Sequence, residues 1–244
     1  MRPLSHSLVL VMTACGPGTV HLDGPTPFGA VRSAVWMELG SGEERSHSFA
    51  LLSAKGACKK AQDMSPEIEE EEAALSLKLE PLLGDADAQC PIYKEHYARM
   101  AELTDPLFGD GLHVLSMVLQ DPAIPSSTAP ATGLYSSFEP DNDTPFFLGS
   151  VSLIEESPYQ IRADAFDCGS NAEALEERLE ASTTRWFLTG GEADARARSS
   201  EKAYRLTLEA SLEDANGDSG GSMRAQGTFQ RCEVAASSSV ALPF

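Results

Sequence analysis

Tyr204-Arg-Leu-Thr-Leu-Glu-Ala-Ser-Leu-Glu213 and Met223-Arg-Ala-Gln-Gly-Thr-Phe229 are the two stretches that decide the fold. Apolar and polar residues alternate along both, which is the pattern of a β-strand with one buried face. The segment between them is rich in Asn, Asp and Gly, which tolerate the positive φ angles of turns. The two stretches therefore predict a β-hairpin, with an apolar face formed by Tyr204, Leu206, Leu208, Ala210 and Leu212 on one strand and by Met223, Ala225, Gly227 and Phe229 on the other.

Strand patterns recur upstream of this hairpin. Apolar residues alternate with polar ones over Phe28–Leu39, and a charged turn connects this run to Ser46–Ser53, so that the two runs predict a second hairpin. Further strands are predicted at Leu112–Leu119, Phe146–Ile154, Tyr159–Cys168 and Thr184–Thr189. The fold class that follows is mainly β, an antiparallel β-sandwich or partly rolled sheet of about eight strands.

Two or three short helices are expected at the periphery of this sheet. Ser65 and Pro66 suit the N-cap and the first position of a helix that starts there, and the carboxylates of residues 69–72 follow close behind. Alternating leucines over residues 75–79 leave the end of this helix undecided between helix and strand. Helical spacing of apolar residues predicts a helix over Cys90–Leu103, and a third helix is predicted over Glu173–Glu180.

No metal site and no cofactor are predicted. The proline-rich stretch Asp121–Pro145 is expected to be a long exposed loop, at which the ectodomain could divide into two subdomains. Asp141-Asn-Asp143 within it could offer oxygens to Ca²⁺, but a Ca²⁺ site takes about six to eight ligands, so a turn is favoured. Consecutive carboxylates such as those of residues 69–72 fan around a helix axis, which favours a solvated helix start over a cation site. His96 has no His or Cys at metal-ligand spacing nearby.

The net charge limits the classes of partner. Of 244 residues, 37 are Asp or Glu and 18 are Lys or Arg, which gives a net charge of −19 at pH 7. A surface of this charge repels the phosphates of nucleic acids and anionic lipid headgroups, so neither is expected as a direct partner. The hydrophobic content of 42% is sufficient for a core, and the length suits one large or two small domains.

The N-terminus carries the pattern of an export signal. Arg2 and the apolar run Leu8–Met12 precede small residues and a cysteine, and the run is too short to span a bilayer, which takes about 20 apolar residues. Met12-Thr13-Ala14-Cys15 resembles the lipobox of bacterial lipoproteins, with Met where Leu is usual. The resemblance implies that residues 1–14 are a signal peptide, that Cys15 is lipidated, and that Gly16, in place of Asp, favours the outer membrane. An ordinary secretory signal with an incidental cysteine is the alternative.

The chain after the signal is expected to have three parts. Residues 15–27 are turn-rich and predict a flexible tether, residues 28–234 form the mainly β ectodomain, and residues 235–244 form a frayed tail. Gly227-Thr-Phe229 ahead of Cys232 resembles the ending of many exported bacterial lipoproteins, in which a last strand is stapled to the sheet.

Four cysteines remain when Cys15 is set aside, and none of them lies in a CxxC pair. An even number without metal-ligand spacing predicts two disulfides in an oxidising compartment. Of the three possible connectivities, the favoured one joins Cys58 to Cys90 and Cys168 to Cys232, because each pair then lies within one half of the chain. Free buried thiols are the alternative.

Gly217-Asp-Ser-Gly-Gly221 resembles the nucleophile loop of chymotrypsin-like serine proteases. That family also needs a His base, an Asp that orients it and an oxyanion hole. Ala57 stands where the family's histidine is expected, so that Ser219 lacks its base and the segment is interpreted as the turn of the last hairpin.

Taken together, these patterns favour a lipid-anchored cell-envelope protein with a non-catalytic binding or structural role, which faces the periplasm or the cell surface. Its expected partners are the membrane, through the lipid on Cys15, and an envelope or extracellular protein. A serine protease-like protein that uses Gly217–Gly221 and a calcium-binding surface module are the alternatives.

Overall fold

The computed structural model describes residues 17–23, 28–39, 46–123, 132–138, 144–168, 172–198 and 203–233. Strands contain 43% of these residues and helices 36%, which confirms the mainly β class. The strands are β1 (Gly18–Leu22), β2 (Ser33–Leu39), β3 (Ser46–Leu52), β4 (Leu112–Gln120), β5 (Gly133–Ser137), β6 (Phe146–Ile154), β7 (Thr183–Ala197), β8 (Ala203–Glu213) and β9 (Ser219–Arg231). The helices are α1 (Ala57–Leu79), α2 (Ala86–Phe108), α3 (Pro158–Ala165) and α4 (Ala172–Ala181), and the 3₁₀ turn η2 (Glu80–Leu82) lies between α1 and α2.

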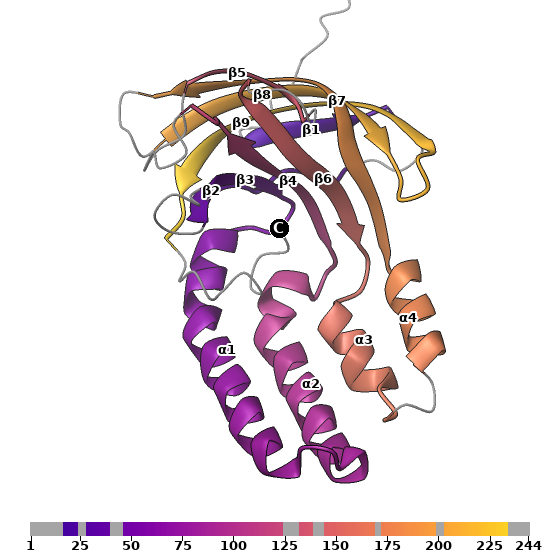
Figure 1. Ribbon diagram of the computed structural model, residues 1–244. Helices are drawn as coiled ribbons and strands as arrows, with labels where there is room; N and C mark the ends of the chain where they lie inside the picture. The colour runs from indigo at the N-terminus through magenta and orange to yellow at the C-terminus, as the bar shows by residue number, and fades with distance from the viewer. Residues whose placement is uncertain are drawn as a thin grey trace, which may run out of the picture.

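The described strands form one sheet that rolls up on itself. Hydrogen-bonded neighbours follow the order β9-β2-β3-β4-β6-β7-β8, and β8 pairs with β9 to complete the ring. β1 adds to β9, and β5 lies against both β6 and β7. The pairings β2–β9 and β5–β6 are parallel, and the other described pairings are antiparallel. The four helices lie together on one side of the sheet (Figure 1).

The larger core lies inside the ring. The predicted last hairpin is present as β8 and β9, and its apolar residues are the buried ones on both strands. They meet an aromatic cluster in which the Phe49 and Phe229 rings are 5.2 Å apart and the Trp36 and Tyr204 rings are 5.4 Å apart, both edge to face. Such contacts add to the gain from burial. The interior of the ring is therefore the main source of stability.

A second core lies outside the ring, between the sheet and the helices. Residues of β2, β3 and β4 that point away from the interior pack against α1 and α2. The helices contribute only the halves nearest the sheet: the buried side chains of α1 end at Ile68, and those of α2 begin at His96. The far ends of both helices extend away from the sheet as an exposed helical hairpin (Figure 1).

Helix α1 begins nine residues earlier than the sequence suggested, at Ala57 in place of Pro66. Gly56, with a left-handed φ of 64°, precedes the first turn, and the Ser33 hydroxyl accepts the N–H of Ala57 at 3.1 Å. That cap comes from β2, far away in sequence, whereas the expected cap Ser65 lies inside the helix together with Pro66. The undecided residues 75–79 are helical as well.

Three further expectations are corrected. Residues 158–165 are helix α3 and not a strand, because only Ile161 of their alternating apolar residues is buried. Residues 18–22 of the expected tether are strand β1, which pairs with β9. Residues 133–137 of the expected loop are strand β5, with Tyr135 buried. The helices are also longer than the short peripheral ones expected, and β4 pairs with β6 across the point of the suggested subdivision.

The two disulfides are present with a different connectivity from the expected one. Cys58 pairs with Cys232 and Cys90 with Cys168, at Cα separations of 5.7 and 5.5 Å. The Cys232 N–H bonds the Trp36 carbonyl at 2.8 Å, so that the end of β9 is brought beside β2 and the start of α1. The parallel β2–β9 pairing thus connects the first and the last part of the fold. The expected disulfides, each within one half of the chain, did not anticipate this contact.

Candidate functional site

A hollow lies where α1 and α2 meet the ends of the strands, and we call it the α1–β4 pocket. Its volume is about 710 Å³. Three segments line it. They are Gly29, Ala30 and Arg32 ahead of β2; Ser53, Ala54, Lys55 and Lys60 from the end of β3 into α1; and Asp105, Pro106, Leu107, Gly109, Asp110, Gly111 and His113 from the end of α2 into β4. Connections at the ends of strands are a common place for binding sites on a rigid scaffold.

Hydrogen bonds between distant segments fix these walls. The Ser33 hydroxyl donates to the Ala54 carbonyl at 2.7 Å, and the Ser53 hydroxyl accepts the His113 N–H at 2.9 Å. Gly111 turns the chain from α2 into β4 with a φ of +77°, which favours glycine, and a Cβ there would lie 3.0 Å from the Ile154 carbonyl oxygen. The pocket is therefore preformed by strand ends and turns.

His113 lies in the wall as a neutral hydrogen-bond donor. Its Nδ1 accepts the Gly29 N–H at 2.7 Å, so that the ring proton is on Nε2. Burial lowers the pKa of His113 below its ordinary value of 6.5, and the carboxylate of Glu155 opposes this shift. The Phe28 ring contacts the imidazole edge to face at 5.5 Å. Because Nδ1 is engaged, His113 is suited to donate to a ligand and not to take its proton.

Three cations line the pocket: Arg32, Lys55 and Lys60. Among the described residues, none of them has a carboxylate oxygen within 4.0 Å, and Lys60 donates instead to the Pro106 carbonyl. Most other cations of the described chain do have such a partner; these are Lys59, Lys78, Lys94, Arg99, Arg178, Arg196, Arg224 and Arg231. The pocket therefore holds three cations without an ion-pair partner among the described residues, together with the carboxylates of Asp105 and Asp110.

The first turn of α1 adds to this positive region. It contains no acidic residue but carries Lys59 and Lys60, although the positive end of the helix dipole disfavours cations there. Lys59 is paired with Asp63 one turn on, at 2.9 Å, whereas Lys60 is directed toward the pocket wall. The dipole and the lysines together favour an anionic group in the pocket.

The sites considered from sequence lie elsewhere. Cys15 and Asp141-Asn-Asp143 fall outside the described residues. Ser219 begins β9, and its hydroxyl accepts the Gly221 N–H at 3.3 Å, in the turn between β8 and β9. Within the described part of the chain, no three His, Cys, Asp or Glu residues gather in a way that could hold a metal ion.

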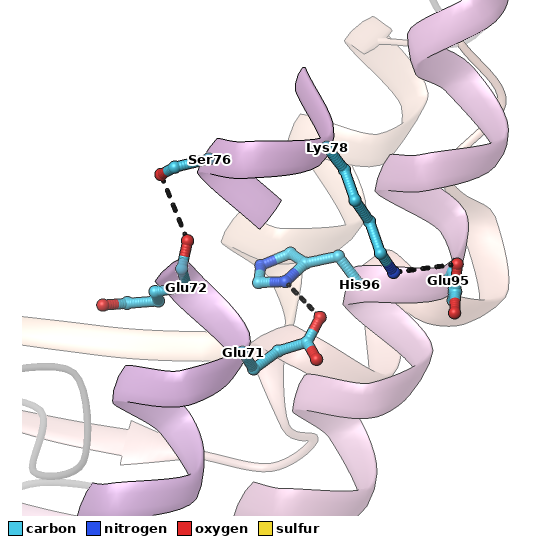
Figure 2. Close-up of polar contacts among 6 residues, drawn as sticks. All are labelled: Glu71, Glu72, Ser76, Lys78, Glu95 and His96. Atoms are coloured by element: carbon cyan, nitrogen blue, oxygen red, sulfur yellow. Dashed lines mark hydrogen bonds and ion pairs between the residues drawn. The ribbon is translucent and has the colours of Figure 1, made fainter. Parts of the chain in front are cut away.

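Glu71 and His96 connect the two long helices, as Figure 2 shows. His96 Nδ1 lies 3.1 Å from the Glu71 carboxylate, and the two side chains are only 11% and 19% exposed. Lys78 and Glu95 form a second, exposed contact between the helices at 3.3 Å. The acidic run 69–72 was expected to be a solvated helix start; it lies in the middle of α1, and Glu71 is half-buried against α2. This contact fixes the helical hairpin and leaves no open coordination site.

A smaller groove of about 310 Å³ lies on the outer face of β4 and β6. Val118, Leu148 and Phe187 line it together with serine hydroxyls and Gly149. Leu148 is 47% exposed and Phe187 is 43% exposed. No charged side chain lines this groove, so that it offers apolar contact and a few hydroxyl groups.

Sequence reasoning did not identify the α1–β4 pocket. The pair Lys59-Lys60 was the available signal, but it becomes informative only when α1 is known to begin at Ala57. The chain matches no model of a known protein family, and it matches no curated protein. In the described part of the chain, none of the helices combines the length and the apolar composition that a membrane span needs.

Proposed function

We propose that the chain is a lipid-anchored protein of the bacterial cell envelope that binds a small charged ligand in the α1–β4 pocket and does not transform it. One observation carries the ligand site: Arg32, Lys55 and Lys60 surround a pocket of about 710 Å³ without a carboxylate partner among the described residues. The lipobox resemblance at Cys15 supports the anchor. The two disulfides are consistent with an oxidising compartment.

The charge distribution supports a binding role for these cations. Exposed ion pairs form at little cost. This chain has 37 carboxylates and 18 Lys or Arg side chains, so that carboxylate partners for its cations are abundant. Cations that face a pocket without such a partner keep their full charge for an acidic group of a ligand. The rim cations Arg32 and Lys55 are exposed, which favours modest affinity and ready release.

The proposal of binding without catalysis rests on the same geometry. His113 holds its proton on Nε2 because Nδ1 accepts the Gly29 N–H, so that it is arranged as a donor. Ser219, the residue of the protease-like motif, lies in the β8–β9 turn, and the histidine of the pocket is held by Gly29 and Phe28. A hydrolytic serine would need a histidine base within hydrogen-bond reach of its hydroxyl.

Co-purification tests the proposed ligand site. The full chain is produced in a bacterium that processes lipoproteins, extracted in detergent and denatured, and the released small molecules are identified by mass spectrometry. We expect a bound molecule that is lost in the double variant Arg32→Gln/Lys55→Gln. Lys59→Gln removes one positive charge from the first turn of α1, outside the pocket, and should retain the molecule. Equal recovery from all three proteins would contradict the proposal.

The anchor has a separate test. Cys15→Ala removes the attachment site, so that the protein should move from the membrane fraction into the soluble or unprocessed fraction, and labelling with radioactive palmitate should be lost. Continued membrane association of this variant would contradict lipid anchoring but would leave the ligand pocket unaffected.

A further inference from the structure

Charges of opposite sign lie on different walls of the α1–β4 pocket. Arg32 and Lys55 come from the segments that flank β2 and β3. Asp105 and Asp110 come from the end of α2 and the turn that leads into β4. All four side chains belong to exposed residues, so that each can reach a molecule that enters from solvent.

These opposite charges do not neutralise one another. Among the described residues, no carboxylate oxygen of Asp105 or Asp110 lies within 4.0 Å of a Lys or Arg nitrogen of the pocket. Lys60, whose ammonium reaches the acidic wall, donates to the carbonyl of Pro106. Surface charges elsewhere in the same chain do meet, as at Lys59–Asp63 and Arg178–Glu156.

The backbone accounts for this separation. The acidic wall is fixed by the bond from the Gly109 N–H to the Asp105 carbonyl and by the Gly111 turn. The basic wall is fixed by the bonds of Ser33 to Ala54 and Ala57. The acidic wall is therefore held by main-chain bonds and the basic wall by bonds of the Ser33 hydroxyl to the main chain, so that Arg32 and Lys55 stay on a different wall from Asp105 and Asp110.

We propose, building on the pocket as the ligand site of the proposed function, that the ligand is a small zwitterion that carries an acidic group and an ammonium group. The acidic group, a carboxylate or a phosphate, is bound by Arg32 and Lys55, near the positive end of the α1 dipole. The ammonium group is bound by Asp105 and Asp110. The Nε2–H of His113, which lines the pocket, is a further donor for the acidic group.

This assignment follows from electrostatic complementarity. A simple anion meets the cations but is repelled by two carboxylates, and a simple amine meets the carboxylates but is repelled by three cations. A zwitterion whose two groups are separated satisfies both walls. An amino acid is also compatible with the excess negative charge of the whole chain because it has no net charge, and the ammonium of an aminoalkyl phosphate reduces the repulsion of its phosphate.

Calorimetric titration of the full-length protein in detergent tests the assignment with three probes of equal chain length: 5-aminopentanoate, pentanoate and pentylamine. We expect 5-aminopentanoate to bind at least about tenfold more tightly than either singly charged probe. Phosphoethanolamine and inorganic phosphate form a second pair that differs in the ammonium group, and comparison of phosphoethanolamine with 5-aminopentanoate reports whether the acidic group is a phosphate or a carboxylate.

Variants of each wall separate the two halves of the inference. Arg32→Gln/Lys55→Gln should weaken binding of 5-aminopentanoate and of pentanoate, each by about tenfold or more. Asp105→Asn/Asp110→Asn should weaken binding of 5-aminopentanoate by a similar factor but should leave pentanoate binding unchanged or improve it. Asp63→Asn and Lys59→Gln remove the same charges outside the pocket and should change neither affinity.

The outcomes distinguish this inference from the proposed function. If pentanoate or phosphate binds as tightly as its zwitterionic counterpart, and the aspartate variants do not weaken binding, the site takes simple anions; the proposed function then stands and the zwitterion assignment is overturned. If no probe binds up to about 10 mM, the zwitterion assignment is likewise overturned. If the molecule that co-purifies is recovered equally from the Arg32→Gln/Lys55→Gln variant, the proposed function itself fails.

Discussion

The β8–β9 hairpin and the α1–α2 hairpin differ in how they are stabilised. Along β8, and from Met223 to Phe229 of β9, alternate side chains are buried inside the ring. Along α1 and α2, burial is confined to the halves near the sheet, and the far halves are mostly exposed and connected by contacts such as that of Glu71 with His96. The first hairpin is a structural part of the ring. The second contributes its sheet-proximal end to a pocket wall.

Deleting one large side chain from each hairpin would test this difference most strongly. Phe229→Ala leaves a cavity beside Phe49 in the ring and should lower the free energy of unfolding by about 3–5 kcal/mol. Leu83→Ala, at a residue 80% exposed in the connection from α1 to α2, should change it by less than about 0.5 kcal/mol. Urea unfolding followed by circular dichroism measures both. Similar losses for the two variants would mean that the helical hairpin is as strongly packed as the ring.

The disulfides provide the second test. Cys58→Ser/Cys232→Ser opens a loop of sequence separation 174 that connects the end of β9 to α1, and Cys90→Ser/Cys168→Ser opens one of 78 that connects α2 to α3. Each loss should cost about 2–4 kcal/mol, and the longer loop should cost more. The unfolding midpoints of the two double variants in urea give the comparison. A larger loss for Cys90→Ser/Cys168→Ser would indicate that the helices are constrained more strongly than the ring.

His113 predicts a pH dependence that is specific to the pocket. Its pKa in the folded protein lies below 6.5, so that the unfolded chain binds the proton first as the pH falls. The contribution to stability is therefore complete above pH 6.5 and is lost as the pH falls below that value. Protonation of Nδ1 also breaks the bond from Gly29, worth about 1 kcal/mol.

The matched variants for this prediction are His113→Gln and His21→Gln. His113→Gln should lose less stability than the natural protein between pH 7 and pH 5, as measured by thermal unfolding. His21→Gln removes an exposed imidazole on β1 and should retain the loss. An unchanged pH dependence in His113→Gln would show that this imidazole is not held neutral by the pocket wall.

The smallest expected effect is that of Ser219→Ala in the β8–β9 turn. The hydroxyl accepts one exposed N–H, from Gly221, so that the free energy of unfolding should change by less than about 0.5 kcal/mol. The natural protein should also fail to react with a fluorophosphonate probe. Stoichiometric labelling that the substitution abolishes would identify a nucleophile and contradict the proposal of binding without catalysis.

The sequence predicted the elements that depend on the pattern of residues close together in the chain. The alternation along Tyr204–Leu212 and Met223–Phe229 identified the last hairpin, the alternation along Phe28–Leu39 and Ser46–Ser53 identified β2 and β3, and β4 and β6 followed from apolar runs. β8 and β9 bury one face, which alternation identifies, whereas β2, β3 and β4 bury both faces, and apolar residues between turn residues mark their extent. The same reasoning failed for residues 158–165, where alternating apolar residues predicted a strand. These residues form a short helix, and of them only Ile161 is buried.

The features that were missed depend on contacts between distant residues. The cap of α1 comes from Ser33, 24 residues before Ala57 in sequence. The pairing of Cys58 with Cys232 depends on the parallel contact of β9 with β2. The α1–β4 pocket is formed by three segments that are distant in sequence. Its charged residues indicate a binding site only once the fold shows that they have no ion-pair partner among the described residues. Local pattern carries none of this information.

Histidine NMR tests the central claim, that the α1–β4 pocket is the ligand site, most directly. The chain has five histidines, among them His113 in the pocket wall and His96 between α1 and α2, so that one spectrum of imidazole Cε1–H signals contains the site and its control. On titration of the full-length protein with 5-aminopentanoate, the His113 signal should shift and saturate, and the His96 signal should stay in place. A stationary His113 signal, with a saturating shift at His96 or at another histidine, would contradict the assignment.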